Sequence, residues 1–173
     1  MTEELKRRQK LVTISLLIIY LVVLTWIILF KMTFSFEELP HLRKINLVPF
    51  AGSVIINQQI DLDEIINNIL IFIPFGIYMG MLKPDWRLIK NIAPIASISL
   101  LFEVTQYIFA IGATDITDFS GNTLGGIIGI SAYFVLCKLF KTEARTNRIL
   151  NLLAIIGTVG VIALMGLLIL SNR

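Results

Sequence analysis

The residues of this chain that could do chemistry are a few carboxylates and amides set among long apolar stretches. Glu103 stands out, because no other charged residue lies between Asn91 and Thr114. An ionisable side chain well inside a bilayer costs about 2.5–3.5 kcal/mol on insertion scales and marks a functional site by default. Carboxylates and amides accept hydrogen bonds from hydroxyls, amides and amines, and carboxylates also bind divalent cations. We therefore expect a polar site around Glu103.

Helical spacing groups these polar residues into two stripes. Ser99, Glu103 and Gln106 follow at i, i+4 and i+7, on one helical face. The second stripe lies on one face if its helix starts near Thr114, a competent N-cap. Its glycine half is predicted to let another helix approach closely, while its acidic half faces a shared cavity. This stripe consists of Asp115, Asp118, Asn122, Gly125 and Gly129.

Five apolar stretches are long enough to hold these residues in a membrane. A transmembrane helix needs about 20 mostly apolar residues. Inside lipid, helices satisfy their own backbone polar groups, so helices are expected throughout. The predicted fold class is an all-α, polytopic membrane helix bundle of about five transmembrane helices. The expected spans are Leu11–Phe30, Ile65–Leu82, Ile92–Ile111, Asp118 or Leu124 to Phe140, and Ile149–Leu170.

Composition supports the membrane interpretation. Hydrophobic residues make up 56% and charged residues 16% of the chain, against about 25% charged in soluble domains. This excludes a disordered chain and argues strongly against a soluble enzyme. A single cysteine, Cys137, excludes an intramolecular disulfide, and a single histidine, His41, excludes a zinc site with several histidines in one chain.

Lysine and arginine residues are unevenly divided between the two ends of the expected spans. Eleven lie in the N-terminal tail and in the connections after the second and fourth spans, and four lie at the opposite ends. Cytoplasmic segments carry the excess of these residues, so the N-terminus is predicted in the cytoplasm and the C-terminus outside. Glu103 then lies about 12 Å below the outer boundary at about 1.5 Å per residue. The polar cluster is therefore expected to open outward.

The expected organisation has four parts. Residues 1–10 form a cytoplasmic basic tail, 11–140 a four-helix core, 141–148 a cytoplasmic loop and 149–173 an additional C-terminal helix. The core includes an outer loop over residues 31–64, far longer than the usual connection of about 4–6 residues, so it should have structure or a role. Its apolar middle, Asn46–Gly52, suggests an interfacial or re-entrant segment.

Together these motifs resemble the VanZ-like membrane proteins. Asn46–Phe50 (NLVPF) comes first, followed by Asn67–Gly76 (NNILIFIPFG) and by E-x-x-Q at Glu103 and Gln106. The pattern D-x-x-D-x-x-x-N-x-x-G-x-x-x-G follows, and the resemblance covers residues 11–140. Many members carry an arginine before the first aspartate, where this chain has Gly112, Ala113 and Thr114. The resemblance implies a protein of the bacterial plasma membrane, linked to the cell envelope, in a family whose namesake is associated with low-level teicoplanin resistance.

Three functions remain open from the sequence. The favoured one is non-enzymatic: an outward pocket that binds a polar-headed membrane lipid, a lipid-linked wall precursor or a glycopeptide antibiotic. A second is an intramembrane enzyme for a lipid-linked substrate, with Glu103 as general acid or base. A third, a small transporter or assembly subunit, fits poorly, because polar groups are expected on only one side of the membrane. The predicted pocket residues are Asn46, Asn67, Asn68, Glu103, Gln106, Asp115, Asp118 and Asn122.

Cofactors and partners follow from the same residues. No cofactor is expected, although a divalent cation could bind at Asp115 and Asp118. A nucleic-acid partner is not expected. Homo-oligomers could form through Gly125 and Gly129.

Overall fold

The computed structural model describes residues 3–30, 42–49, 55–56, 59–60 and 62–171. All five helices in this part of the chain are long and apolar enough to cross a membrane, which confirms the predicted membrane helix bundle. Short strands form two two-stranded sheets, one parallel (β1–β4) and one antiparallel (β2–β3). In chain order the elements are α1 (Glu3–Phe30), β1 (Leu42–Asn46), β2 (Ile55–Ile56), β3 (Gln59–Ile60), α2 (Asp63–Leu82), α3 (Leu88–Phe109), β4 (Ile111–Asp115), α4 (Ile116–Phe140) and α5 (Glu143–Ser171).

Two predicted boundaries were wrong. The third span was extended to Ile111, but α3 ends at Phe109, because Ala110 takes a left-handed conformation (φ 55°) and the chain turns into β4. The loop predicted over residues 141–148 is mostly helix, because α5 already begins at Glu143. The Thr142 hydroxyl accepts a hydrogen bond from the Arg145 N–H (3.3 Å), which satisfies a free donor of the first turn.

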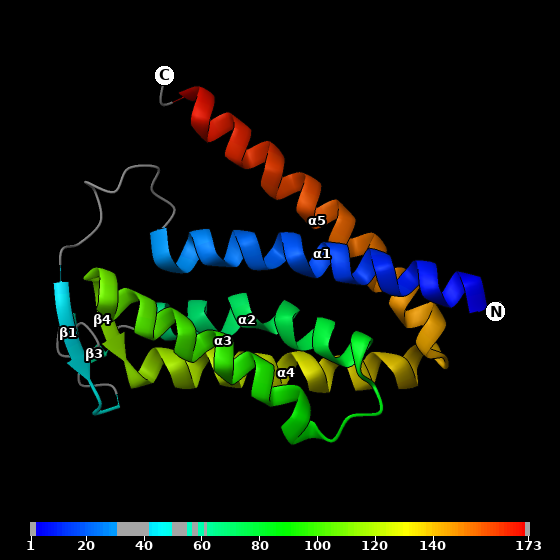
Figure 1. The fold of residues 1–173 in the computed structure, drawn as a ribbon, viewed down its shortest axis with the longest axis horizontal. Coiled ribbons are helices and arrows are strands. Elements are labelled where there is room, and N and C mark those ends of the chain that lie inside the picture. The colour runs from blue at the N-terminus through cyan, green and yellow to red at the C-terminus, as the bar shows by residue number, and fades with distance from the viewer. Residues whose placement is uncertain (1–2, 31–41, 50–54, 57–58, 61, 172–173) are drawn as a thin grey trace.

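The ends of the helices segregate by charge. Figure 1 shows the start of α1, the α2–α3 connection and the α4–α5 connection at one end of the molecule, and β1 and β4 at the other. The first end carries the eleven basic residues that the positive-inside rule assigns to the cytoplasm. The sheet end is therefore the end expected outside. Non-helical backbone at membrane depth is tolerated where it is buried in protein or lines a cavity, and β4 packs against α3 and pairs with β1.

Helices α2 and α4 pack closely through glycines. A Cβ added to Gly125 would clash with the carbonyl oxygen of Ile69, and one added to Gly129 with that of Ile73. On α2, Gly76 lies equally close to the carbonyl of Gly126. The Gly-xxx-Gly pair predicted to admit a neighbouring helix thus lies against α2, and a third glycine on α2 takes part.

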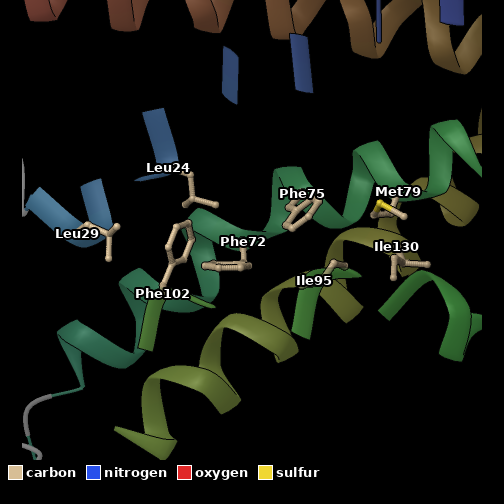
Figure 2. Packing of buried hydrophobic residues seen from close by; sticks show 8 residues of the cluster. All are labelled: Leu24, Leu29, Phe72, Phe75, Met79, Ile95, Phe102 and Ile130. Carbon is tan, nitrogen blue, oxygen red and sulfur yellow. The ribbon is translucent and has the colours of Figure 1, made fainter. Parts of the chain in front are cut away.

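A hydrophobic core holds α1 to α4 together at the centre of the bundle. Phe72 and Ile95 are completely buried within it. Figure 2 shows its side chains converging from four helices: Leu24, Leu29, Phe72, Phe75, Met79, Ile95, Phe102 and Ile130. This core holds α1 to α4 together next to the sheet end, where these helices carry their polar residues.

Helix α5 is attached mainly to α1 and then diverges from the bundle (Figure 1). The attachment includes a buried polar pair: the Asn151 amide donates to the Thr13 hydroxyl at 3.0 Å. Asn151 is buried because of this pairing with α1.

The long connection between α1 and α2 returns to the bundle through β1. The backbone of β1 pairs in parallel with β4, with Asn46 opposite Asp115. Arg43 adds a hydrogen bond to the carbonyl of Ile108 at 3.1 Å and lies 5.5 Å from the centre of the Tyr107 ring. This parallel pair was not predicted. The segment predicted as interfacial or re-entrant, Asn46–Gly52, is described only through residue 49, and His41 lies outside the described residues.

Candidate functional site

A cavity of about 620 Å³ lies at the sheet end, between α1, α2, α3, α4 and the β1–β4 pair. We call it the polar cavity. All eight residues predicted for a pocket line it: Asn46, Asn67, Asn68, Glu103, Gln106, Asp115, Asp118 and Asn122. They come from five separate elements, so only the folded chain brings them together.

Glu103 is the buried acid of this cavity. Glu103 is only 3% exposed, so its carboxylate lies inside the bundle and does not face lipid. One carboxylate oxygen accepts the backbone N–H of Asp115 at 2.9 Å, and the Thr114 hydroxyl donates to the Glu103 carbonyl, also at 2.9 Å. These two bonds join α3 to β4, and they account for the position of Glu103 in the wall.

Asp115 caps α4, and this corrects the predicted helix start. Thr114 was expected to be the N-cap, but it lies in β4 and its hydroxyl is bound to α3. Instead, the Asp115 side chain accepts the Thr117 N–H at 2.7 Å, because its extended backbone (φ −126°) suits a cap. Its other oxygen accepts the Asn46 amide at 2.9 Å. Asp115 thus belongs to the cavity as the end of a strand, not as part of the helical stripe.

Two further amides connect the helices around the cavity. Asn68 on α2 donates to the Asp118 carboxylate on α4 at 2.8 Å. Asn122, one turn further along α4, donates to the Ser99 hydroxyl on α3 at 3.0 Å. Asn122 and Ser99 are both buried. Hydrogen bonds of this kind between membrane helices average about 0.6 kcal/mol each, so their main effect is to fix how the helices face the cavity.

Gln106 connects α3 to the end of α1. Its amide donates to the carbonyl of Ile28 at 3.3 Å, which leaves its Oε1 pointing away from that contact. Within the described residues, neither Gln106 Oε1 nor Asn122 Oδ1 has a hydrogen-bond partner, although both atoms are buried. A buried acceptor without a partner costs roughly 1–3 kcal/mol. Both atoms are enclosed in the packing of the wall and are not open to the cavity.

The charge of the described lining is predominantly negative. Four carboxylates, those of Glu64, Glu103, Asp115 and Asp118, face one ammonium, that of Lys44. Glu64 was not predicted to line the pocket, although it lies three and four residues before Asn67 and Asn68, on the same face of α2. Lys44 enters the wall through the unpredicted β1 strand, so its place could not be inferred from helical spacing.

The predicted metal candidates do not form a metal cluster with other ligands. Within the part of the chain that the structure describes, no three His, Cys, Asp or Glu side chains lie close enough together to hold a metal ion. Asp115 uses both of its oxygens for Asn46 and Thr117. A divalent cation therefore does not enter the function proposed below.

The chain is similar to known membrane proteins over most of this structure. A model of the VanZ/LLP1 family matches residues 17–141, from the middle of α1 to the end of α4, and stops before α5. Protein VanZ of Enterococcus faecium is 39% identical over 126 residues, which are 72% of this chain and 74% of that protein. No solved structure matches. The matched region contains every residue of the polar cavity.

Proposed function

The chain belongs to the VanZ/LLP1 family of multi-pass membrane proteins, and on this premise we propose that it binds a cell-envelope ligand in the polar cavity. The family links the chain to glycopeptide resistance. The proposed role is to contribute to teicoplanin resistance at the bacterial plasma membrane. The ligand is a polar-headed lipid, a lipid-linked wall precursor or the lipophilic antibiotic.

The observation that carries the proposal is the burial of Glu103 in a wall shared by six elements. A carboxylate in a membrane helix is costly to insert and is found where it serves a function. Here it lies with five amides and two aspartates around one cavity. Asn46, Asn68 and Asn122 fix the surrounding elements, so the wall is organised before a ligand arrives. Such preorganisation lowers the cost of binding.

The direction of the opening supports an envelope ligand. The polar cavity lies at the sheet end, and Figure 1 shows that the basic connections lie at the other end of the bundle. Since the positive-inside rule assigns the basic end to the cytoplasm, the cavity opens to the outer leaflet. That is the side on which wall precursors are used and on which a glycopeptide acts.

Binding is favoured over the enzymatic alternative by the contacts of the acids. Glu103 holds the start of α4 in place through Asp115, and Asp115 caps that helix. Both acids therefore have a positioning role in the wall.

The test is a resistance measurement in a teicoplanin-susceptible bacterial host. Wild type, Glu103→Gln and Asp118→Asn are expressed at equal levels in the membrane, as judged by immunoblot. Wild type is expected to raise the minimum inhibitory concentration of teicoplanin, and both variants to return it to the vector level. The control is Asp85→Asn, which alters an exposed acid in the α2–α3 connection and should behave as wild type. Full resistance in both cavity variants would remove the cavity from the mechanism.

A further inference from the structure

The connection between α2 and α3 gathers basic and aromatic side chains on one short turn. We call residues 83–90 the basic turn. Lys83, Arg87 and Lys90 are exposed, and none of them forms an ion pair with a residue that the structure describes. The ammonium of Lys83 lies 4.7 Å from the centre of the Trp86 ring, which is itself partly exposed. Three cationic groups are therefore available to an anion from outside the chain.

A buried amide fixes the shape of the basic turn. Asn91 is completely buried, and its side-chain amide donates to the carbonyl of Lys83 at 3.2 Å and to that of Trp86 at 3.5 Å. The Trp86 N–H closes the turn on the Lys83 carbonyl at 3.1 Å. The backbone that carries the charged side chains is thus ordered before a ligand arrives, which lowers the cost of binding.

Helix length places the basic turn among the lipid headgroups. Helix α2 has 20 residues, so it is about 30 Å long, which matches a hydrocarbon layer about 30 Å thick. It has no length left to extend into water, and the basic turn follows it directly. Leu88 and Ile89, at the start of α3, are largely exposed, as expected for side chains that face lipid. Tryptophan is enriched at this depth, where its ring lies at the headgroup level.

The other basic segments of the same end differ from the basic turn. In the N-terminal tail Lys6 pairs with Glu3 at 3.1 Å and Arg8 with Glu4 at 2.7 Å. Helices α1 and α5 have 28 and 29 residues, and each exceeds the hydrocarbon layer by about 12 Å, so their basic starts can reach past the headgroups. Helix α5 also has an acid in its first turn, Glu143, whereas α3 has none.

We propose that the basic turn binds the phosphate of an anionic phospholipid at the basic end of the bundle (Figure 1). A guanidinium binds phosphate bidentately, which suits Arg87, and the two lysines add point charges. One acid, Asp85, lies among the three basic residues, so the turn remains positive. A lipid fits better than an acidic protein, because the exposed side chains of Leu88 and Ile89 continue the surface toward hydrocarbon. This surface is separate from the polar cavity and goes beyond the proposed function.

The test measures lipid retention by the full-length protein in detergent, with native mass spectrometry as the readout. Dioleoyl phosphatidylglycerol, which is anionic, is compared with dioleoyl phosphatidylcholine, which has the same chains and no net charge. Wild type is expected to retain the glycerol lipid about tenfold more strongly, because each basic residue near the headgroups attracts anionic lipid. A hexaglutamate peptide, which carries negative charge without acyl chains, is added as a competitor.

Two triple variants separate the basic turn from the general charge of this end. The first combines Lys83→Gln, Arg87→Gln and Lys90→Gln and is expected to retain both lipids equally. Its matched control removes the same two lysines and one arginine from the end of α4 and the start of α5, all of them exposed, and should keep most of the preference. The control combines Lys138→Gln, Lys141→Gln and Arg145→Gln.

Single variants keep the test decisive if a triple variant does not fold. Arg87→Gln is expected to lower the preference for the glycerol lipid severalfold, because it removes the bidentate donor. Arg145→Gln, its control, should leave the preference unchanged.

Three results would overturn the proposal. Equal retention of both lipids by wild type would show that the protein has no preference for an anionic headgroup. An equal loss in the two triple variants, or in the two single variants, would show that the charge of the whole end attracts the lipid and that the basic turn is not a distinct surface. Displacement of the glycerol lipid by an equal concentration of the peptide would show a surface for an acidic protein.

Discussion

The carboxylate of Glu103 accepts the backbone N–H of Asp115 at 2.9 Å. A side chain of α3 thus holds the residue that caps α4, and the buried acid is tied to the start of the next helix. The bond links the residue expected to bind ligand to the local structure around it. A substitution at Glu103 can therefore lower stability through the loss of this bond, in addition to any effect on ligand binding.

Replacing Glu103 by two uncharged side chains of similar length tests this link. Glu103→Gln keeps an oxygen acceptor for the Asp115 N–H, whereas Glu103→Met does not. The Met variant is expected to be less stable than the Gln variant by about 1 kcal/mol, the net contribution of one hydrogen bond. That difference corresponds to roughly 2–4 °C in the midpoint of thermal unfolding for a chain of this size. Equal midpoints in detergent would show that the bond contributes nothing.

The Asn46–Asp115 pair predicts a rescue by exchange. Asn46→Asp places two carboxylates at the 2.9 Å contact and should lower the unfolding midpoint by several degrees. Adding Asp115→Asn restores one donor and one acceptor, and keeps an oxygen for the Thr117 N–H. The double variant is therefore expected to recover most of the lost stability. A double variant no more stable than Asn46→Asp would argue against this contact.

Glycine packing between α2 and α4 predicts a position-dependent cost. Gly125→Ala adds a methyl group where the Ile69 carbonyl already lies, and backbone cannot move aside cheaply. The expected destabilisation is roughly 1–3 kcal/mol, as for other overpacked sites. The matched control is Gly160→Ala on α5, where the added methyl group meets open space. Equal thermal midpoints for the two variants would contradict the close approach.

The buried pair between α1 and α5 predicts a measurable coupling. Thr13→Val and Asn151→Leu each remove one partner of the 3.0 Å bond. A double-mutant cycle should give a coupling energy of about 0.6 kcal/mol, the average for hydrogen bonds between membrane helices. Thermal or chemical unfolding of the four proteins supplies the data. Strictly additive effects would mean that another contact holds α5.

Membrane orientation predicts a labelling pattern in intact cells. In a Cys137→Ser background, Lys44→Cys lies at the sheet end and Arg145→Cys at the basic end, and both parent residues are exposed. A membrane-impermeant maleimide should label position 44 in intact cells and position 145 only after permeabilisation. The reverse pattern would place the polar cavity on the cytoplasmic side and remove the support for an extracellular ligand.

The sequence determined the five helices and the composition of the site. Hydrocarbon thickness sets a length that each apolar stretch must match, so the spans could be predicted without knowledge of their neighbours. Glu103 was identified for the same reason, because a charge in such a stretch is costly wherever the helix packs. Helical spacing placed Ser99 and Gln106 on its face, and the Gly-xxx-Gly pattern indicated a close approach without indicating which helix approaches.

Only the tertiary structure decided how these residues meet. Asn46 reaches Asp115 through a parallel pairing of two short strands far apart in the chain, and such pairing leaves no periodic signal in either strand. Asp115, and not Thr114, is therefore the N-cap of α4, and the same strand pairing brings Lys44 into the wall. A second, apolar cavity depends likewise on where α5 lies against α1 and α2. Local sequence fixes how each segment satisfies its own backbone, whereas the partners of its side chains depend on the packing of the whole bundle.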